Sequence, residues 1–430
     1  MPLWVSEYGC IYCGSTNSVL PDGNLQLDKN DFSALLGLLD EAEESDSGIQ
    51  KFFSYSRPYG REQLKVQNYV GVIQTGNGTH IEVLPKLAKH TDISTARELL
   101  VRMLVELQDS PFRTGTVASL NAHKMPLFEL LMRQFLGHVM DIIHKGLVRT
   151  YVECTDNLVY LRGKLELAVQ TRLNAARAGV FHCTYDEYDV DRPVNRLVKG
   201  ALQVVSRLSQ DEENIQYCRE ALYVFDDVPA TSNVEQDFRN MRRDRLMQHY
   251  LPALPSCRMI LERMNPLTQS GERKAISMLF PMERVFEDYV AAKLPGQFEG
   301  WRVRTQVAGK SLVQQHRARK IFALRPDLML ENGDRRIVAD TKWKLLNQAD
   351  RANKYGISQA DIYQLFAYCK KYLPGQAPKI VILIYPSSER FDRPLEPFWY
   401  RDNEEVLYVL PYDLQKDELV VGEYAQVFSN

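Results

Sequence analysis

The stretch from Arg325 to Lys342 reads RPDLMLENGDRRIVADTK and decides how the last third of the chain is interpreted. Apolar and polar residues alternate on both sides of a turn-forming segment, Glu331-Asn332-Gly333-Asp334. This pattern predicts a β-hairpin, with one strand over Arg325–Leu330 and the return strand over Arg336–Lys342.

Three charged side chains of this hairpin are expected to converge. Side chains alternate across a strand, so Asp340 and Lys342 share one face of the return strand, about 6–7 Å apart along it. Asp327 lies on the partner strand and reaches the same place if the hairpin pairs as written. Carboxylates hold a hard cation, and a lysine steadies an attacking water or a developing charge. The three residues therefore suit a divalent-metal site for phosphodiester hydrolysis.

The hairpin is surrounded by basic residues. Between Arg302 and Lys344 there are eleven Lys or Arg against four Asp or Glu, and QHRARK, Gln315–Lys320, is the densest run. A solvated basic loop would explain any one such run. Its coincidence with the carboxylate hairpin favours a zone that contacts backbone phosphates. The candidates are Arg317, Arg319, Lys320 and Lys344.

Composition sets broad limits on the chain. Its 430 residues predict two or three domains, and 45% hydrophobic with 25% charged residues is typical of globular proteins. A net charge of −2 argues against coating nucleic acid by bulk electrostatics. No apolar run is long enough to span a membrane. The first residues lack a basic region followed by an apolar core, and the seven cysteines are mostly scattered, so a cytoplasmic location is expected.

The first hundred residues predict a β-rich unit with one helix. The helix is expected over Asp31–Glu43, with Asp31 as its cap, and a hairpin over Gln63–Lys86 around a glycine-rich turn. No GxxxxGK[ST] pattern occurs here or elsewhere, so this chain is not expected to bind a nucleotide. Cys10 and Cys13 form half of a zinc ribbon, but two packing thiols are favoured because no second ligand pair exists.

From about Thr91 to residue 270 the pattern is mainly helical, with one β excursion over Arg149–Leu165. The acidic Tyr185–Asp191 segment lacks the glycine and distal Glu of an EF-hand, so it is interpreted as the acidic flank of a helix. The expected helices are Thr95–Leu107, Pro126–Leu147, one from Pro193, and further helices through about Arg263 that include the Arg- and Asp-rich stretch Asp237–Tyr250. Met264-Asn265-Pro266 and Ser270-Gly271 predict a linker.

After this linker a helix, three strands, a second helix and further strands are expected. The first helix, Pro281–Lys293, carries Glu283 and Glu287 one turn apart on one flank. The second, Ser358–Tyr372, places Gln364 and Tyr368 one turn apart. Its predicted buried residues are Ile362, Leu365, Phe366 and Cys369. The remaining predicted strands are Trp301–Val307, Lys379–Tyr385 and Leu407–Pro411.

Arg-Pro-Asp327, then Asp340-x-Lys342, then Gln364-xxx-Tyr368 resembles the PD-(D/E)xK nuclease superfamily, including its QxxxY-bearing branch. The short D-x-K pattern alone is weak, but three pieces in order on strand, strand and helix form a strong signal. The alternative is a salt-bridged hairpin with an unrelated amphipathic helix behind it.

The resemblance implies a role for each matching residue. Asp327 and Asp340 would be ligands of Mg²⁺, which accepts one or two carboxylates together with waters and phosphate oxygens. Lys342 would position the nucleophilic water. Gln364 and Tyr368 would be supporting contacts. Glu287, and more loosely Glu283, matches the helical acid that many members use as an extra metal ligand.

Four further stretches resemble the McrC family, and the resemblance covers most of the chain: GVIQTGNGTHIEVLPKL, PLFELLMRQFLGHV, NLVYLRGKL and YDEYDVDRPVNRLVKGAL. McrC proteins are the nuclease subunits of modification-dependent McrBC restriction systems. The resemblance implies a chain inactive alone, which binds a hexameric AAA+ GTPase, McrB, through its N-terminal half and stimulates GTP hydrolysis. The assembly would then cleave double-stranded DNA that carries modified cytosine. The opening segment with Cys10 and Cys13 has no counterpart in this resemblance.

The expected fold is an α+β N-terminal and helical middle region followed by an α/β restriction-endonuclease-like domain, a mixed sheet flanked by helices. The predicted domains are 1–110, β-rich and partner-binding; 111–270, mainly helical; and 271–430, the nuclease. Two other functions stay open. In the first, the chain is a binding module that mainly activates a ring NTPase. In the second, it is a free-standing RecB-like repair nuclease.

Overall fold

The computed structural model describes residues 3–44, 52–89, 92–107, 125–177, 179–241, 245–263, 276–317, 319–375, 377–401 and 404–428. The chain divides into two compact units. Unit 1 joins Met1–Arg113 and Val117–Lys124 to Ser277–Asn430, and unit 2 covers Met125–Ile276 with three residues of the preceding segment. The predicted linker and the boundaries near 110 and 270 lie outside the described residues, so the three-domain division stays a prediction.

The N-terminal part of unit 1 contains two sheets. A five-stranded sheet has the order β3-β4-β2-β6-β5, and a four-stranded sheet has the order β1-β8-β7-β12. The predicted glycine hairpin is confirmed as the antiparallel pair β7 and β8. The strands are β1 Leu3–Ser6, β2 Cys10–Gly14, β3 Ser18–Val19, β4 Leu25–Asp28, β5 Phe53–Ser56, β6 Gln63–Val66, β7 Tyr69–Gln74, β8 His80–Leu84 and β12 Ile276–Pro281.

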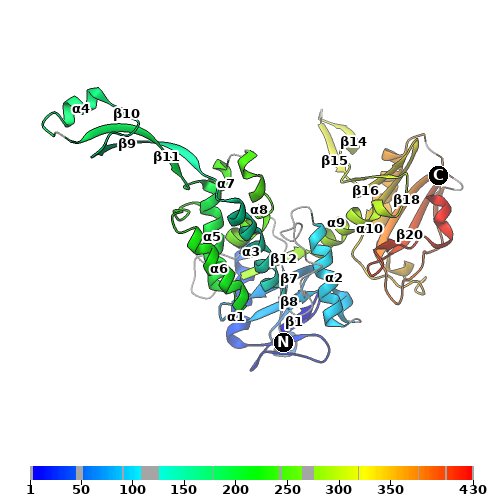
Figure 1. Ribbon diagram of the computed structural model, residues 1–430. Coiled ribbons are helices and arrows are strands. Elements are labelled where there is room, and N and C mark those ends of the chain that lie inside the picture. The colour runs from blue at the N-terminus through cyan, green and yellow to red at the C-terminus, as the bar shows by residue number, and fades with distance from the viewer. Residues whose placement is uncertain are drawn as a thin grey trace. The chain divides into compact units, whose positions relative to one another are not determined.

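Strand β12 reaches this N-terminal sheet from the distant part of the sequence (Figure 1). It packs tightly against Gly71, where an added Cβ would lie 2.0 Å from the carbonyl oxygen of Met278. Helix α9, Met282–Lys293, follows β12 directly, and the amide of Met282 donates to the carbonyl of Asn68 at 3.1 Å. The predicted helix over Pro281–Lys293 is thereby confirmed, and its first residue is fixed to the N-terminal sheet.

Helix α1, Lys29–Glu44, begins two residues earlier than predicted, and Asp31 is not its cap. Asp28 Oδ1 accepts the first free amides of the helix instead. Asp31 is 1% exposed, and its carboxylate accepts four side-chain hydrogen bonds of 2.6–2.9 Å. The donors are Asn17, Thr75, Asn77 and Thr79. Asp31 therefore anchors the glycine-rich turn between β7 and β8.

Replacing this anchor, Asp31→Ala, is expected to lower the free energy of unfolding by about 3 kcal/mol, because the buried Thr75 hydroxyl and three further donors lose a charged acceptor. Burial would raise the pKa of Asp31, but the hydrogen bonds from Thr75 and the other donors hold it below its ordinary value. The stabilisation is thus present at neutral pH and lost as the pH falls through this lowered pKa. Urea denaturation at several pH values measures both effects. Asp334→Ala, at an exposed turn, is the control, and equal losses for the two variants would contradict the prediction.

Unit 2 contains a helical bundle (Figure 1). The predicted helices at Pro126 and Pro193 are confirmed as α3 and α5, as is the unit 1 helix α2, Ile93–Glu106. The further helices predicted through about Arg263 are present, and within Asp237–Tyr250 helix α7 ends at Asn240 and a separate 3₁₀ helix covers Arg245–Tyr250. The bundle helices are α3 Leu127–Lys145, α5 Pro193–Leu208, α6 Glu212–Val224, α7 Val234–Asn240 and α8 Leu254–Arg263.

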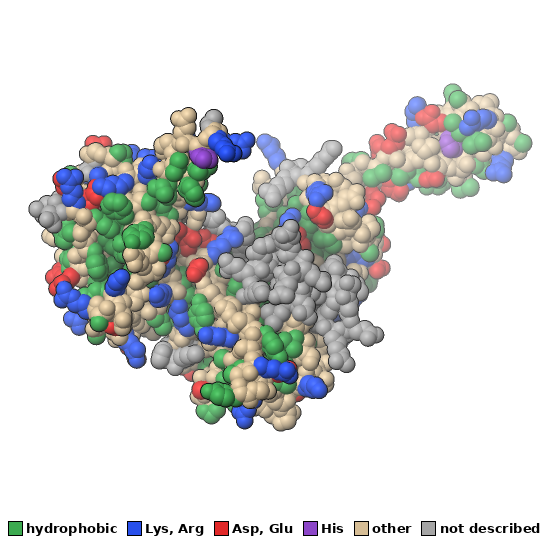
Figure 2. Space-filling model, turned by 180° about the vertical axis from the view of Figure 1, so that it is seen from behind, with side chains coloured by type: hydrophobic (Ala, Val, Ile, Leu, Met, Phe, Trp, Pro, Cys, Tyr) green, Lys and Arg blue, Asp and Glu red, His purple; other side chains and the backbone are tan. Residues whose placement is uncertain are grey.

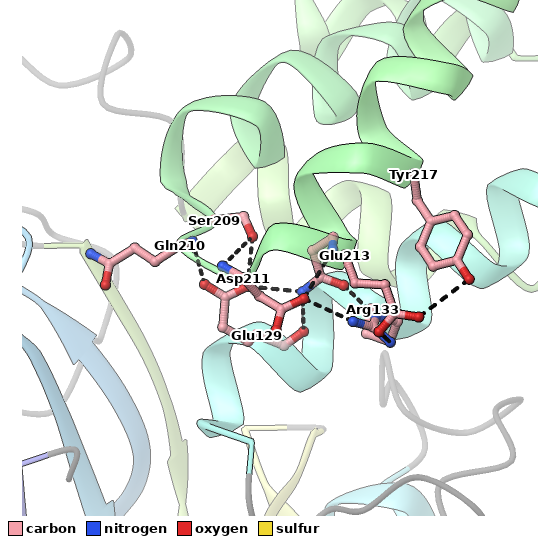
Figure 3. Close-up of polar contacts among 8 residues, drawn as sticks. Glu129, Arg133, Ser209, Gln210, Asp211, Glu213 and Tyr217 are labelled. Atoms are coloured by element: carbon pink, nitrogen blue, oxygen red, sulfur yellow. Dashed lines mark hydrogen bonds and ion pairs between the residues drawn. The ribbon is translucent and has the colours of Figure 1, made fainter.

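A polar cluster fixes the junction of α3, α5 and α6 (Figure 3). Glu129 of α3 is 3% exposed, and its carboxylate accepts hydrogen bonds from the Ser209 hydroxyl, the Gln210 amide and the Asn214 side chain at 2.7–2.8 Å. Arg133, one turn further along α3, pairs with Asp211 at 2.8 Å. The connection between α5 and α6 is thus bonded to α3 at both of its ends. The bundle is therefore a rigid support for the strands β9 (Thr150–Leu158) and β11 (Phe181–Asp189), which project from it.

An antiparallel ribbon interrupts the helices of unit 2. Strands β9, Thr150–Leu158, and β11, Phe181–Asp189, pair along their whole length, and β10, Lys164–Leu165, and α4, Leu167–Leu173, lie at the far end (Figure 1). The predicted β excursion is confirmed. The interpretation of Tyr185–Asp191 as the acidic flank of a helix is wrong for Tyr185–Asp189, because these residues belong to β11. Pairing with β9 fixes their extended backbone.

The C-terminal part of unit 1 is built on a seven-stranded mixed sheet with the order β13-β16-β17-β18-β20-β19, to which β21 is added at β20. β16 and β17 are antiparallel, whereas β17, β18 and β20 are parallel. Helix α10, Gln359–Tyr372, packs on the sheet. The strands are β13 Arg302–Thr305, β16 Leu328–Asn332, β17 Arg335–Thr341, β18 Lys379–Pro386, β19 Phe398–Arg401, β20 Glu405–Asp413 and β21 Glu418–Leu419.

The sequence predicted three strands between α9 and α10, but a separate hairpin of β14, Lys310–His316, and β15, Arg319–Leu324, is also present, and the basic run lies at its end. The predicted burial of Phe366 is also wrong. In α10, Phe366 is 40% exposed and contacts Tyr400. Tyr368 and Tyr372 are buried instead, because their hydroxyls have backbone acceptors at the helix–sheet boundary. None of the helices in the described residues is both long and apolar enough to cross a membrane.

Candidate active site

The hairpin predicted from Arg325 to Lys342 is present, with shorter strands. β16 and β17 pair from Leu328↔Ala339 to Asn332↔Arg335, so a two-residue turn joins them and Gly333 adopts a φ of 56°. This conformation suits glycine. Extended by one position, the register places Asp327 opposite Asp340. Asp327 therefore precedes β16, and Lys342 follows β17, at the same end of the hairpin.

Both aspartates are held in place by their neighbours. Asp327 Oδ2 accepts hydrogen bonds from the amide and the hydroxyl of Thr341, at 2.8 and 2.9 Å. Asp340 is 1% exposed, and its Oδ2 forms an ion pair with Lys342. Its other oxygen, Oδ1, is buried and has no hydrogen-bond partner among the residues that the structure describes. The predicted convergence of Asp327, Asp340 and Lys342 is thus present in the structure.

The carboxylates repel one another electrostatically. Burial raises the pKa of Asp340 to about 7, and the charge of Asp327 adds to the rise. Burial also raises the pKa of Asp327. Burial opposes the charge of Lys342, but Asp340 holds the lysine pKa above its ordinary value, so this residue stays cationic. One lysine faces more than one buried acid, and the cluster favours additional positive charge.

The two glutamates of α9 differ in their surroundings. Glu287 is half-buried, and burial raises its pKa to about 8, with further contributions from Asp327, Asp288 and Asp340. Glu287 therefore lies within electrostatic range of both aspartates. Glu283 is exposed and acts instead on groups of the N-terminal sheet, including Glu7 and Lys86. The structure brings Glu287 to the site but does not show Glu283 there.

Gln364 and Tyr368 lie behind the cluster, on α10. Gln364 Nε2 donates to the Tyr368 hydroxyl at 2.7 Å, and this hydroxyl donates to the carbonyl of Arg325 at 3.1 Å. The pair therefore supports the chain that leads into Asp327. Tyr368 also interacts electrostatically with the aspartates and with Lys342.

Sequence reasoning missed Asp361 in the first turn of α10. Its charge acts on both Asp340 and Lys342, and it accepts a hydrogen bond from the Tyr385 hydroxyl at 3.3 Å. Its position three residues before Gln364 is a signal that could have found it, since residues three apart share a helix face.

The predicted phosphate-contacting residues lie in two places. Arg317, Arg319 and Lys320 are exposed at the end of the β14–β15 hairpin, where basic side chains gather (Figure 2). Lys344 is exposed two residues beyond Lys342, and its ammonium donates to the carbonyl of Gly356. The hairpin returns through β15 directly to Asp327, so the basic tip and the acidic cluster belong to one continuous segment.

The donor set fits a hard divalent cation. The described residues contain no group of three or more His, Cys, Asp or Glu side chains arranged as a complete metal site. Mg²⁺ does not need one, because it is usually held by one or two carboxylates, waters and substrate phosphates. The buried, unpartnered Oδ1 of Asp340 and the raised carboxyl pKa values are the features that a bound cation would relieve.

Comparison with known proteins decides the family. The family described as McrBC 5-methylcytosine restriction system component matches residues 64–386, three quarters of the chain. The chain belongs to this McrBC family. The match spans the glycine hairpin, the helical unit, the ribbon and the Asp327/Asp340/Lys342 cluster. Among curated proteins, no match was found.

Solved structures show the same fold for the McrBC-family chain. A chain from a refined half-complex of a tetradecameric assembly of Thermococcus gammatolerans McrB AAA+ hexamers with bound McrC superposes with a TM-score of 0.69 at 16% identity. The match covers 100% of this chain and 98% of that one. A chain from the Thermococcus gammatolerans McrBC complex superposes with a TM-score of 0.50 at 17% identity, covering 69% and 87%. The expected fold, in which helices are combined with mixed β-sheets, is confirmed.

Proposed function

We propose that this McrBC-family chain is the Mg²⁺-dependent DNA endonuclease subunit of a modification-dependent restriction complex, with a PD-(D/E)xK active site. The main support for this proposal is the convergence of Asp327, Asp340 and Lys342 at one end of a hairpin. One buried oxygen there, Asp340 Oδ1, has no hydrogen-bond partner among the described residues. The mixed sheet, the following α10 with Gln364 and Tyr368, and the family match support the same function.

Each residue has a distinct role in this proposal. Asp327 and Asp340 would hold the cation, and Glu287 on α9 would add its negative charge from within electrostatic range of both. When bound, Mg²⁺ supplies Lewis-acid stabilisation of the charge that develops on the phosphate. Lys342 stays cationic beside Asp340, so it orients the attacking water by donating a hydrogen bond to it. Thr341 fixes the Asp327 carboxylate, and Gln364 with Tyr368 fixes the backbone before it.

The β14–β15 hairpin is proposed as a DNA contact. Its base is anchored to α10: Lys310 Nζ donates to the carbonyl of Lys371 at 2.6 Å, and the single proton of the Tyr372 hydroxyl is shared between the carbonyls of Val307 and Leu324, at 3.0 and 2.8 Å. Its tip carries exposed basic side chains, which suit backbone phosphates. Phe322 is 67% exposed on the same hairpin, so an apolar surface is available for contact with sugars or bases.

Neutralising the tip, with Arg317, Arg319 and Lys320 all changed to Gln, is expected to weaken DNA binding and its salt dependence together. The slope of log affinity against log salt should become shallower by about 3, because each lost phosphate contact removes about one. Fluorescence anisotropy with labelled duplex DNA over a salt series measures the slope. The matched control changes Arg57, Arg61 and Lys65, exposed in the N-terminal region, to Gln. An unchanged slope in the tip variant would show that these residues do not contact phosphates.

We further propose that the chain binds a McrB-like hexameric AAA+ GTPase and stimulates its hydrolysis, as the assemblies containing the similar chains are McrB hexamers with bound McrC. The ribbon of unit 2 is the proposed contact. Its far end exposes hydrophobic side chains that a folded surface rarely leaves to water (Figure 2). They are Val159, Tyr160, Leu161, Leu167 and Leu173. The ribbon lies in the N-terminal half of the chain but outside residues 1–110, the domain that the sequence prediction assigned to partner binding.

Reconstitution tests the whole function. The purified chain is combined with the McrB-like subunit from the same organism, Mg²⁺, GTP, and plasmid DNA with or without methylated cytosine. Cleavage of methylated DNA only when both proteins are present is the expected result. Cleavage by the chain alone would favour the free-standing RecB-like nuclease, and GTPase stimulation without any cleavage would favour the pure binding module.

A further inference from the structure

A buried polar link joins the N-terminal sheet to the segment that carries Lys342. β1 and β8 are parallel neighbours with Ser6 opposite Leu84, so the residues after these strands meet at one sheet edge. Glu7 follows β1, and Lys86 begins the 3₁₀ helix Lys86–Lys89 after β8. Both side chains reach Trp343, the residue after Lys342.

The contacts on Trp343 are specific. Its indole nitrogen donates to Glu7 Oε2 at 2.8 Å, and its carbonyl accepts a hydrogen bond from Lys86 Nζ at 2.9 Å. The Lys86 ammonium also lies 5.0 Å from the centre of the indole ring. Trp343 is 4% exposed and Glu7 fully buried, so water does not compete for the bond between them, whereas Lys86 is half-buried. Glu7 thus fixes the side chain of Trp343, and Lys86 fixes its carbonyl.

This link acts on the backbone of the proposed catalytic lysine. β17 ends at Thr341, and the amide of Lys342 still donates to the carbonyl of Ile384 at 2.9 Å. Beyond Lys342 the chain leaves the sheet, and Trp343 is the next buried point. Lys342 therefore lies between an anchor in its own sheet and an anchor supplied by Glu7 and Lys86.

The same tryptophan touches the helix that carries Glu287. Its ring centre lies 5.3 Å from that of Phe286, the residue before Glu287 on α9. This helix also starts from β12 of the N-terminal sheet, where Met282 is bonded to Asn68. The N-terminal sheet is thus connected to the acidic cluster by two routes, through Trp343 and through α9.

We propose that Glu7 and Lys86 are positioning residues of the nuclease site, which act through Trp343 to hold Lys342 and α9 in their working places. The N-terminal sheet then contributes to cleavage itself. The inference rests on the proposed nuclease function. Nothing in the linear sequence indicates it, because Glu7 and Lys86 are separated from Trp343 by 336 and 257 positions.

The test uses the full chain assembled with its McrB-like partner and compares Lys86→Met, Glu7→Leu and Trp343→Phe with wild type. Lys65→Met, an exposed lysine of the same region, is the matched control. Single-turnover cleavage, DNA affinity, the Mg²⁺ concentration for half-maximal rate, GTP turnover and thermal unfolding are measured. The cleavage rate is expected to fall about tenfold or more, with a raised Mg²⁺ requirement, as for other residues that orient metal-site groups. DNA affinity and stimulated GTP turnover should stay within about twofold, since these functions use other surfaces.

Glu7 and Trp343 should also act as one unit. In the Trp343→Phe background the indole donor is already lost, so Glu7→Leu is expected to add no further loss of cleavage. If Lys86→Met fails to fold, Trp343→Phe carries the test, because it keeps an aromatic ring in the core. Wild-type cleavage by the folded variants overturns the inference, and so does a parallel loss of cleavage and GTP stimulation. Asp340→Asn in the same assay separates the two levels. If it cuts DNA normally the nuclease proposal fails, whereas a dead Asp340→Asn beside a fully active Lys86→Met removes only the positioning role.

Discussion

Asp340→Asn is expected to lower the rate of DNA cleavage by about 10³-fold or more while the fold and the partner's GTP turnover are kept. The amide has nearly the same shape but no charge, so it cannot pair with Lys342 or bind a hard cation as a carboxylate does. Removing a group that acts directly on the transition state has effects of this size. Because Asp340 is crowded by Asp327 and its pKa is raised, neutralising it should not destabilise the chain. Single-turnover cleavage with the assembled complex measures the rate.

The matched control for this change is Asp334→Asn. Asp334 lies in the exposed turn of the same hairpin, six residues before Asp340, so the chemistry of the substitution is identical and only its position differs. The control should cleave at the wild-type rate. Lys342→Met should match the loss in Asp340→Asn, since the same contact is broken from the other side. Cleavage within about tenfold of wild type in both Asp340→Asn and Lys342→Met would rule out this site.

The second large effect is expected at the ribbon of unit 2. Changing Val159, Tyr160 and Leu161 together to Asp should abolish stimulation of the McrB-like GTPase, and cleavage with it. These side chains are 79%, 56% and 61% exposed, so the substitutions remove no core packing. Exposed aromatic and aliphatic anchors commonly dominate binding energy, and three charges at such a contact weaken binding by about a hundredfold or more.

GTP turnover at a fixed concentration of partner, with increasing amounts of the chain, measures the ribbon's contribution. Tyr223→Asp is the control, because Tyr223 is 84% exposed on α6 of the same unit but lies outside the ribbon. The triple variant should bind DNA as wild type does, since its basic β14–β15 hairpin is unchanged. Normal GTPase stimulation by the triple variant would place the partner contact elsewhere on the chain.

The active-site hairpin could be predicted because several local signals agree. The glycine at the turn, the alternation in the strands and the continuous apolar run of β18 each indicate the observed element. The convergence of Asp327, Asp340 and Lys342 follows from the geometry of paired strands. The proximity of Gln364 to Tyr368 follows from their spacing of four residues on a helix. Asp361 was missed because an acid in the first turn of a helix is ordinary, and only tertiary packing brings it near Lys342.

Elements with weak local signals were harder to predict. β11 is rich in acids and tyrosines and has little apolar alternation, so its extended form depends on pairing with β9. The β14–β15 hairpin is exposed on much of both strands, which hides the usual strand pattern. Asp31 looked like a helix cap because its role requires the turn at Thr75, forty-four positions away. The link from Glu7 and Lys86 to Trp343 is the extreme case, since it joins residues 336 and 257 positions apart.

The most direct test of the central claim follows DNA cleavage and GTP turnover in one reaction, with methylated duplex DNA, Mg²⁺ and the reconstituted complex. Wild type should show both activities. Asp340→Asn should retain stimulated GTP turnover and leave the DNA intact, which would assign cutting to this chain and hydrolysis to its partner. Cleavage of the DNA by the Asp340→Asn complex at the wild-type rate would contradict the account.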